Sequence, residues 1–289
     1  MTTTRAISGW TRSVLAAVLL SSASAEVAEA ANTIAIDVAT GKVLSQSNAT
    51  QRWYPASTTK LMTAYLALKA LEEQTVQADT PIVMTRTAAR QAPSKMGFPP
   101  GSVMRLDAAL RMMLVKSAND VAYAIGQSLG GGSMEVFVAS MNRAAAELGM
   151  HDTHFVNANG LPGEGQYSSA KDLGILGVAI RRQFPAFTDY FSTEAVSVGQ
   201  AVAKNGNGLL GRYSGADGMK TGYICASGFN LVASATRDGR TIVAVVLGAE
   251  GPIVRERLAA EVIENGFNTN PRSIRETVTD LPQSSGPPA

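Results

Sequence analysis

The sequence contains little of what disulfide or metal chemistry requires. Its 289 residues include one cysteine, Cys225, and two histidines, His151 and His154. A single cysteine excludes an internal disulfide framework and any site built from several thiolates. The two histidines stand three positions apart, but no third ligand lies near them in the sequence, so we expect no bound metal and no cofactor.

The chain also lacks a strong net charge and a hydrophobic run of membrane-spanning length. Its formal net charge is +2, which shows no footprint for nucleic acid or for a polybasic membrane contact. The apolar run at residues 14–20 is far shorter than the ~20 residues of a spanning helix. Arginines before this run and small residues after it are typical of a secretory signal. We therefore expect residues 1–30 to be a signal peptide cleaved near Ala25 or Ala30, and the protein to be exported to the periplasm or the outside.

What the sequence does contain is a series of strand and helix patterns of globular composition. Hydrophobic residues make up 45% and charged residues 17% of the chain. Alternating or apolar runs predict a hairpin at 33–46 and two adjoining strands at 229–236 and 241–247. Periodic apolar positions predict helices at 57–74, 106–115, 120–129, 133–148, 171–182 and 252–266. Together they predict an α+β protein, with an antiparallel sheet flanked by helices and an all-helical part.

The domain organisation follows from the same patterns. We expect residues 31–269 to form one folded domain. Residues 270–289 are rich in proline and serine and have no apolar period, so we expect this tail to be disordered. The tail contains no amphipathic stretch either, and we therefore expect no stable membrane anchor.

A serine and a lysine stand three residues apart where an apolar helix begins, at Ser57 and Lys60. Positions i and i+3 lie on one face of a helix, so the hydroxyl and the amine can approach each other. A desolvated lysine can take the proton of a serine nucleophile, and a helix N-terminus favours the oxyanion of acyl transfer. The pattern alone is weak evidence, because Ser168 and Lys171 repeat it. A helix cap followed by a solvated lysine is the simpler interpretation of either pair.

Two further motifs give the first one its context. Ser117 and Asn119 stand in a break between two predicted helices, and the Lys-Thr-Gly at 220–222 leads into the closing strands. Each is weak alone, since Ser140 and Asn142 repeat the Ser-x-Asn spacing. In this order and context, the three motifs indicate an active-site serine acyl transferase of the penicillin-recognising kind.

The sequence around these motifs resembles the low-molecular-mass penicillin-binding proteins that act as serine-type D-alanyl-D-alanine carboxypeptidases. The resemblance implies a fold like that of β-lactamases and transpeptidases. It also implies removal of the terminal D-alanine from peptidoglycan pentapeptides through an acyl-enzyme on Ser57, with β-lactams as covalent inhibitors. Many members carry a second, all-β domain and a C-terminal amphipathic helix, and we expect neither from residues 270–289. The resemblance covers residues 32–268 and is strongest at 56–63, 117–120, 152–161, 217–223 and 228–236.

Chemistry and resemblance together suggest roles for the catalytic side chains. Lys60 would take the proton of Ser57, which requires a lowered lysine pKa. Ser117 would pass a proton to the leaving D-alanine nitrogen. Asn119 has the amide to hold a peptide carbonyl and to orient Lys60. Lys220 would support the Ser117 relay and face an anionic substrate end.

The remaining candidate residues would bind the substrate. Gly222 would let the substrate backbone come close to its strand. By resemblance, the backbone N–H groups of Ser57 and Tyr223 form the oxyanion hole. Arg255 matches the carboxylate-binding arginine of the family, with Thr221 assisting.

Several alternatives stay open at this stage. An endopeptidase would cut the same bond type. A class A β-lactamase would need a deacylating glutamate in a Glu-x-x-Leu-Asn context, which is missing between Asn119 and Lys220, so we expect slow penicillin deacylation. A catalytically inactive wall-binding or sensor protein is disfavoured because all three motifs are intact. We expect Cys225 to be a packed small residue, and residues 95–98 to be either a cleft loop or an ordinary surface loop.

Overall fold

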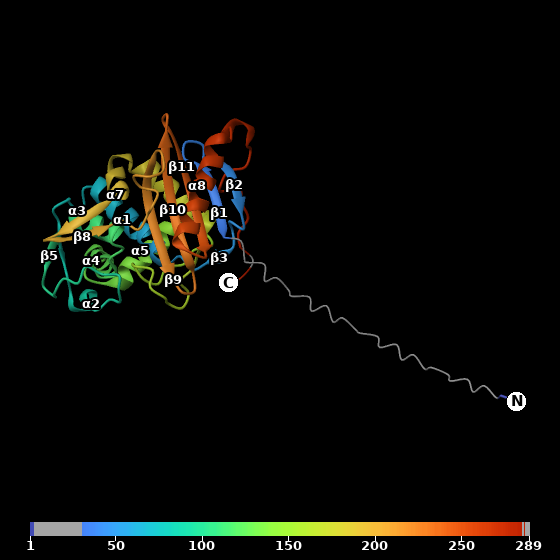
Figure 1. The fold of residues 1–289 in the computed structure, drawn as a ribbon. Helices are drawn as coiled ribbons and strands as arrows, with labels where there is room; N and C mark the ends of the chain where they lie inside the picture. The colour runs from blue at the N-terminus through green and yellow to red at the C-terminus, as the bar shows by residue number, and fades with distance from the viewer. Residues whose placement is uncertain (3–30, 285, 287–289) are drawn as a thin grey trace.

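The computed structural model describes residues 1–2, 31–284 and 286, so the expected signal peptide lies almost wholly outside the described residues. Its centre is a five-stranded antiparallel sheet in the order β2-β1-β11-β10-β9 (Figure 1). The two adjoining strands expected near the C-terminus are present, and β9 forms one edge of the sheet. The strands are β1 (Asn32–Asp37), β2 (Val43–Ser47), β9 (Ala216–Ile224), β10 (Gly228–Arg237) and β11 (Arg240–Ala249).

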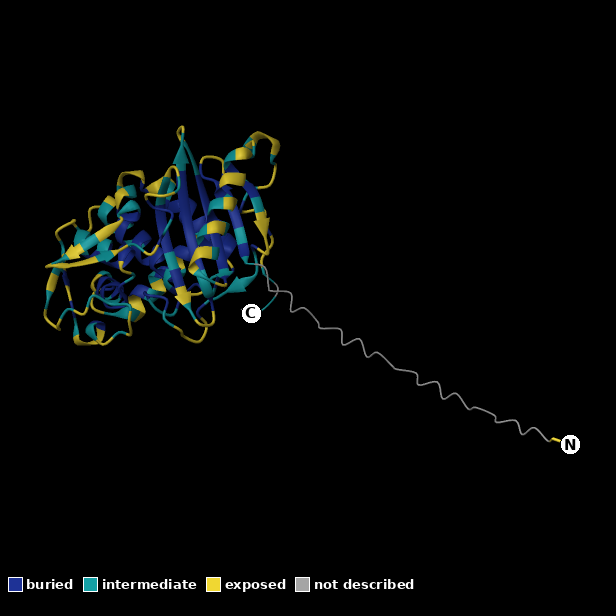
Figure 2. Ribbon diagram, in the orientation of Figure 1, coloured by how far each residue is buried: buried dark blue, intermediate teal, exposed yellow. Residues whose placement is uncertain are grey.

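Helices cover both faces of this sheet. Successive residues of β11 point to opposite faces: Val243 and Val245 belong to the core cluster that includes α6 (Ala170–Gln183), and Ala244 and Val246 pack with α8 (Pro252–Asn268). Both faces are therefore dry, and β10 and β11 are buried along their centres (Figure 2). This explains why these two strands are continuous apolar runs in the sequence and do not alternate.

The other long helices lie beside the sheet and share a hydrophobic core with it. They are α1 (Lys60–Glu72), α3 (Leu106–Val115), α4 (Asn119–Leu129) and α5 (Met134–Leu148), together with the short α2 (Arg86–Ala89). The predicted α+β class, with its all-helical part, is confirmed. Short elements complete the chain: β3 (Arg52–Trp53), η1 (Ala56–Thr59), β4 (Pro81–Val83), β5 (Val103–Arg105), β6 (Ser168–Ser169), η2 (Pro185–Phe187), α7 (Thr188–Ser192), β7 (Ala195–Val198), β8 (Ala201–Lys204) and η3 (Pro271–Ser273).

The C-terminal tail corrects one expectation. Residues 270–284 are not disordered, because they pack along the β1–β2 turn and α6. The Val278 amide donates to the Gly41 carbonyl at 2.9 Å, and the Val278 and Leu281 side chains are 6% and 8% exposed. Two apolar residues and a few backbone hydrogen bonds hold the segment, and its composition does not reveal them.

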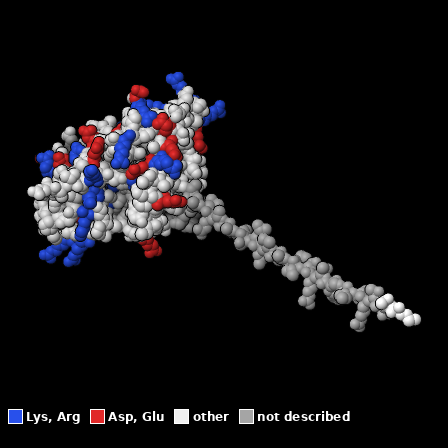
Figure 3. Space-filling view, in the orientation of Figure 1, with Lys and Arg blue, Asp and Glu red and all other residues white. Residues whose placement is uncertain are grey.

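The outer surface carries both signs of charge. Lysine and arginine stand among aspartate and glutamate on the face seen in Figure 3, as the near-balanced composition predicts. Within the described part of the chain, no helix is both long and apolar enough to span a bilayer.

Candidate active site

The nucleophile and base candidates meet where η1 runs into α1. Ser57 lies in η1, Lys60 is the first residue of α1, and the Lys60 Nζ stands 2.8 Å from the Ser57 Oγ. Ala56, just before the serine, adopts a φ of +47°, a left-handed conformation that is uncommon outside glycine. The Gly160 backbone packs against this turn, and a Cβ added at Gly160 would collide with the Ala56 carbonyl oxygen. The serine is therefore held in a constrained turn.

The Lys60 ammonium group is completely enclosed. Its side chain is 0% exposed, and Nζ also contacts the Asn119 Oδ1 at 2.7 Å and the Asn159 carbonyl oxygen at 2.5 Å. Burial lowers the pKa of Lys60 well below its usual value; the Lys220 charge acts in the same direction and the Asp120 charge opposes it. The site therefore favours the neutral amine.

The orientation of the Asn119 amide follows from its second contact. Its Nδ2 donates to the Ala92 carbonyl at 2.9 Å, so its oxygen must face Lys60. Both this amide oxygen and the Asn159 carbonyl can only accept hydrogen bonds. A neutral Lys60 therefore donates its two N–H bonds to them, which leaves its lone pair directed at the Ser57 hydroxyl. This is the arrangement a general base requires.

Ser117 lies at the break between α3 and α4, as expected. Its φ is +59°, and it stands two residues before Asn119, whose Oδ1 contacts the Lys60 Nζ. In the part of the chain that the structure describes, the Ser117 hydroxyl forms no direct hydrogen bond. The Lys220 Nζ instead donates to the Thr221 carbonyl at 2.9 Å. The proposed Ser117–Lys220 relay is therefore not a direct contact in this structure.

The loop at residues 91–98 belongs to the site and is not an ordinary surface loop. The Asp120 carboxylate, 0% exposed, accepts the amides of Met96 at 3.0 Å and Gly97 at 2.9 Å. The Asn159 Nδ2 donates to the Gln91 Oε1 at 2.9 Å. Asp120 and Asn159 were not among the predicted site residues. They were visible only as members of the segments that resemble the family, at 117–120 and 152–161.

A second buried cation lies on β9. Lys220 is 1% exposed, and burial together with the charge of Arg255 lowers its pKa to about 7. The Arg255 Nη2 contacts the Gly206 carbonyl and the Glu256 Oε1, each at 3.0 Å, and its buried Nε has no partner among the described residues. A Cβ built on Gly206 would stand 3.0 Å from the Thr221 Oγ1. Arg255, Lys220 and Thr221 thus share one cationic region.

Gly222 brings the two halves of the site together. A Cβ at this position would stand 3.0 Å from the Pro55 carbonyl oxygen and 3.1 Å from the amides of Ser57 and Thr58. The sequence suggested that the glycine admits the substrate. The structure supplies another reason, since the glycine lets β9 pack against η1 and places the Ser57 amide beside the strand that continues to Tyr223.

The repeated motifs have structural roles. Lys171 Nζ contacts the Asp152 Oδ2 at 3.1 Å and the Asp172 Oδ1 at 3.7 Å, so it is an ion-paired cation. The Ser168 Oγ lies 2.8 Å from the Thr153 Oγ1. In the other repeat, Asn142 holds the backbone of Phe155 through its amide oxygen and nitrogen, both at 2.8 Å. Of the two Ser-x-x-Lys pairs, the one at Ser57 and Lys60 contacts a residue of another motif, Asn119.

The two histidines and the single cysteine were the other residues that the sequence singled out. His154 Nδ1 is 2.8 Å from the Gly165 carbonyl oxygen. No group of three or more histidine, cysteine, aspartate or glutamate side chains suited to a metal occurs in the described residues. Cys225 is exposed, with its Sγ 3.9 Å from the Tyr223 Oη, so the expectation of a packed residue is wrong. The turn after β9 leaves it at the surface.

Sequence comparison finds a protein family and relatives that this chain resembles. A family model described as D-alanyl-D-alanine carboxypeptidase matches residues 20–251. The D-alanyl-D-alanine carboxypeptidase DacD of Salmonella typhimurium is 35% identical over 240 residues, which are 81% of this chain and 61% of that protein. This chain therefore spans about three fifths of that relative's length.

Solved structures share the fold. Penicillin-binding protein 5 from Haemophilus influenzae superposes with a TM-score of 0.79 and 32% identity, covering 83% of this chain and 71% of that one. Penicillin-binding protein D2 from Listeria monocytogenes, in its ampicillin-bound form, gives a TM-score of 0.75 and 29% identity, covering 82% and 97%. The predicted fold, like that of β-lactamases and transpeptidases, is confirmed.

Proposed function

The chain belongs to the D-alanyl-D-alanine carboxypeptidase family, and we propose that it removes the terminal D-alanine of peptidoglycan stem peptides through an acyl-enzyme on Ser57. The observation that supports this most directly is the Lys60 cage. Its Nζ lies 2.8 Å from the Ser57 Oγ and is held by two oxygens that only accept hydrogen bonds. A buried, neutral amine in contact with a hydroxyl is an activated serine nucleophile.

In the acylation step, Lys60 takes the proton as the Ser57 Oγ attacks the carbonyl of the penultimate D-alanine. The negative charge that develops on the carbonyl oxygen would be met by the backbone N–H groups of Ser57 and Tyr223. Ser117 then passes a proton to the nitrogen of the terminal D-alanine and regains one from Lys60, so the C–N bond breaks and Lys60 is neutral again. Asn119 orients Lys60 throughout and holds a substrate carbonyl.

In the deacylation step, water replaces the departed amine. Because the chain lacks a glutamate in the deacylating context of class A β-lactamases, Lys60 would also take the proton of this water. The oxygen of water bonds to the acyl carbon, the ester bond to Ser57 breaks, and the Oγ regains a proton from Lys60. The same lysine thus acts in both halves of the reaction.

The terminal carboxylate of the substrate would bind in the cationic region. Arg255 and Lys220 supply positive charge there, and Thr221 supplies a hydroxyl. The relative from Listeria monocytogenes was solved in an ampicillin-bound form, which supports binding of β-lactams. We propose that they are covalent inhibitors of this chain and that they deacylate slowly. We also propose that the protein is exported and acts where stem peptides are found.

Intact-mass measurement after incubation with benzylpenicillin tests the nucleophile. We expect a covalent adduct on the native chain and on Ser168→Ala, the repeat of the motif, and none on Ser57→Ala. Release of D-alanine from a pentapeptide tests the reaction. An adduct that survives Ser57→Ala contradicts the nucleophile, and rapid β-lactam turnover without D-alanine release contradicts the carboxypeptidase activity.

A further inference from the structure

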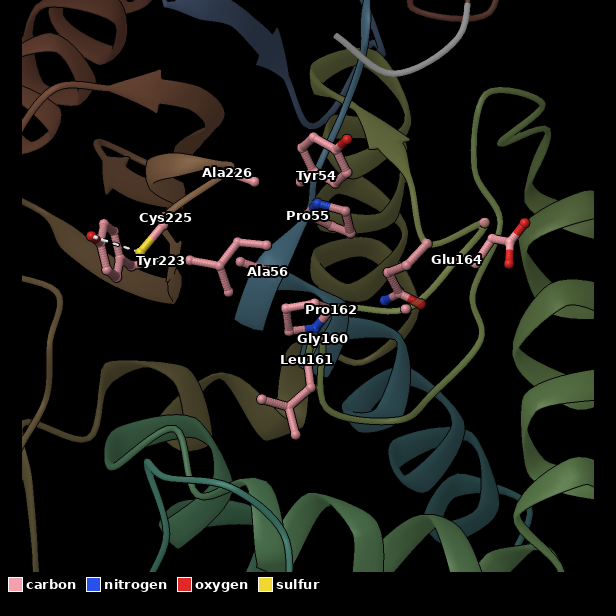
Figure 4. A pocket seen from close by; sticks show the side chains of 14 residues that line it. Tyr54, Pro55, Ala56, Gly160, Leu161, Pro162, Glu164, Tyr223, Cys225 and Ala226 are labelled. Carbon is pink, nitrogen blue, oxygen red and sulfur yellow. Dashed lines mark hydrogen bonds between the residues drawn. The ribbon is translucent and has the colours of Figure 1, made fainter.

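Gly222 separates two chemically different parts of the candidate site. Tyr223 and the residues after it line a cavity of about 960 Å³ (Figure 4), in which Glu164 is the one charged residue. Lys220 and Thr221, which come before Gly222 in β9, belong instead to the cationic region. A negatively charged end of a substrate therefore finds its counter-charge in the cationic region and not in the cavity.

The cationic region also holds an acidic side chain, Glu256, which follows Arg255 near the start of α8. Its Oε1 accepts hydrogen bonds from the Arg255 Nη2 at 3.0 Å and from the Gly208 amide at 3.2 Å. The two side chains are only 23% and 6% exposed, so water screens the pair in part. Among the described residues, Glu256 is the one carboxylate that pairs with Arg255.

The same carboxylate holds the segment at residues 206–208 against α8. A Cβ added at Gly208 would collide with the Glu256 carboxylate, so the two groups are closely packed. In the same segment, the Asn207 Nδ2 donates to the Gly218 carbonyl of β9 at 2.8 Å. The segment thus joins α8 to β9, and Glu256 forms one of its two attachments named here. These contacts fix the position of the carboxylate beside the arginine.

This pairing changes what the cationic region offers to an anion. The Arg255 Nη2 already donates to the Gly206 carbonyl and to Glu256, while its buried Nε has no partner among the described residues. A carboxylate bound there would be attracted by Arg255 and Lys220 and repelled by Glu256. The charge of Glu256 must therefore weaken the binding of a carboxylate relative to a neutral group of the same shape.

We propose that Glu256 is a specificity-determining residue that acts through Arg255, and that its charge lowers the preference for peptides with a free C-terminal carboxylate over peptides with a neutral terminus. The inference rests on the proposed function, which places the terminal carboxylate in the cationic region. With Glu256 in place, a neutral terminus such as an amide is tolerated better than the two cations alone would allow.

Two peptides of nearly equal shape measure this preference. One is Nα,Nε-diacetyl-L-lysyl-D-alanyl-D-alanine, and the other is its C-terminal amide. Glu256→Gln keeps an oxygen for both hydrogen bonds and removes the charge. We expect the ratio of kcat/KM, free acid over amide, to rise about 3-fold to 10-fold in this variant, through a lower KM for the acid. If the amide is cleaved too slowly to follow, its inhibition constant takes the place of its KM. An unchanged or lower ratio overturns the inference.

The matched control is Glu261→Gln, which removes the same charge from the same helix. Glu261 is 52% exposed and pairs with Arg257 at 3.3 Å. We expect its ratio to stay at the native value, and an equal rise in both variants would overturn the role of Glu256. A purely structural role of Glu256 predicts that Glu256→Gln changes both peptides alike, which leaves the ratio unchanged.

Acylation by benzylpenicillin, which carries a carboxylate, supplies a readout that does not depend on peptide cleavage. We expect the second-order rate of acylation to rise by a similar factor in Glu256→Gln and to stay native in Glu261→Gln. If acylation responds in this way although the native protein cleaves neither peptide, the carboxypeptidase activity fails and the role of Glu256 stands. If the native protein releases D-alanine but neither the ratio nor acylation responds, the role of Glu256 fails and the proposed function stands.

Discussion

The Lys60 Nζ lies 2.8 Å from the Ser57 Oγ, and its two other hydrogen bonds lead to the oxygens of Asn119 and Asn159. These oxygens can only accept, so they fix which part of the amine faces the serine. The repeated pair at Ser168 and Lys171 has the same spacing in sequence, but its lysine contacts carboxylates. The proposed base and the ion-paired lysine thus differ by their partners and not by their spacing.

This difference predicts opposite effects for two lysine substitutions. Lys60→Met should lower the rate of penicillin acylation about 10²–10⁴-fold, the usual contribution of a general base, while the protein stays folded. Lys171→Met should retain acylation but unfold at lower urea, because Asp152 and Asp172 lose a buried partner. Acylation kinetics and urea unfolding of both variants measure this. The reverse pattern, with acylation lost in Lys171→Met and kept in Lys60→Met, would contradict the assignment of Lys60 as the base.

The pH dependence of acylation should follow the protonation of Lys60. The neutral amine is the active form, so the acylation rate should rise with pH through the lowered pKa of Lys60. The Asp120 charge raises that pKa, and Asp120→Asn should therefore move the midpoint of the rise to lower pH. Rate–pH profiles of the native protein and the variant measure the shift. A midpoint that moves upward or stays in place contradicts the electrostatic role of Asp120.

The second buried lysine predicts a pH dependence of stability. The pKa of Lys220 is about 7 in the folded protein, against about 10.4 when it is exposed to water in the unfolded chain. Between these values the unfolded state binds the additional proton, so the free energy of unfolding rises with pH, by up to about 1.4 kcal/mol per pH unit. Below pH 7 both states are protonated and this contribution is constant. Urea unfolding should show a steeper rise from pH 7 to 10 in the native protein than in Lys220→Met.

Substitution of Gly222 tests the contact between β9 and η1. In Gly222→Ala the methyl group would stand 3.0–3.1 Å from three backbone atoms around Ser57, which must move. We expect acylation to fall about 10²-fold or more, as it does when an oxyanion donor is displaced. Gly251→Ala is the matched control, because its φ of −158° is ordinary and nothing lies within 4 Å of the added Cβ. Normal acylation by Gly222→Ala would show that this packing is not needed.

The docked tail can be distinguished from a disordered one by stability alone. Val278 is 6% exposed, so Val278→Ala should lower the free energy of unfolding by about 1–2 kcal/mol through lost burial and a small cavity. Val83→Ala, at a side chain that is 46% exposed, should have a much smaller effect. Equal urea midpoints for the two variants would mean that the tail does not pack in solution.

The sequence alone determined the elements and most of the residues of the candidate site. The apolar runs of β10 and β11 and the periodic helices depend on neighbours close in the chain, so they can be recognised locally. The Ser-x-x-Lys at Ser57 stood out because two other motifs followed it in order. The resemblance to the family supplied the proposed substrate-binding residues, including Arg255.

The tertiary structure decided what depends on contacts between distant segments. The Asn159 oxygen that holds Lys60 belongs to the backbone, so no residue type in the sequence marks it. The tail around Val278 packs through two apolar residues in a polar composition, and Gly222 is required by η1, which lies far from it in sequence. Spacing along a helix brings Ser57 and Lys60 together, but only the folded chain removes water from the amine, and that loss of solvation lowers the lysine pKa as the proposed base requires.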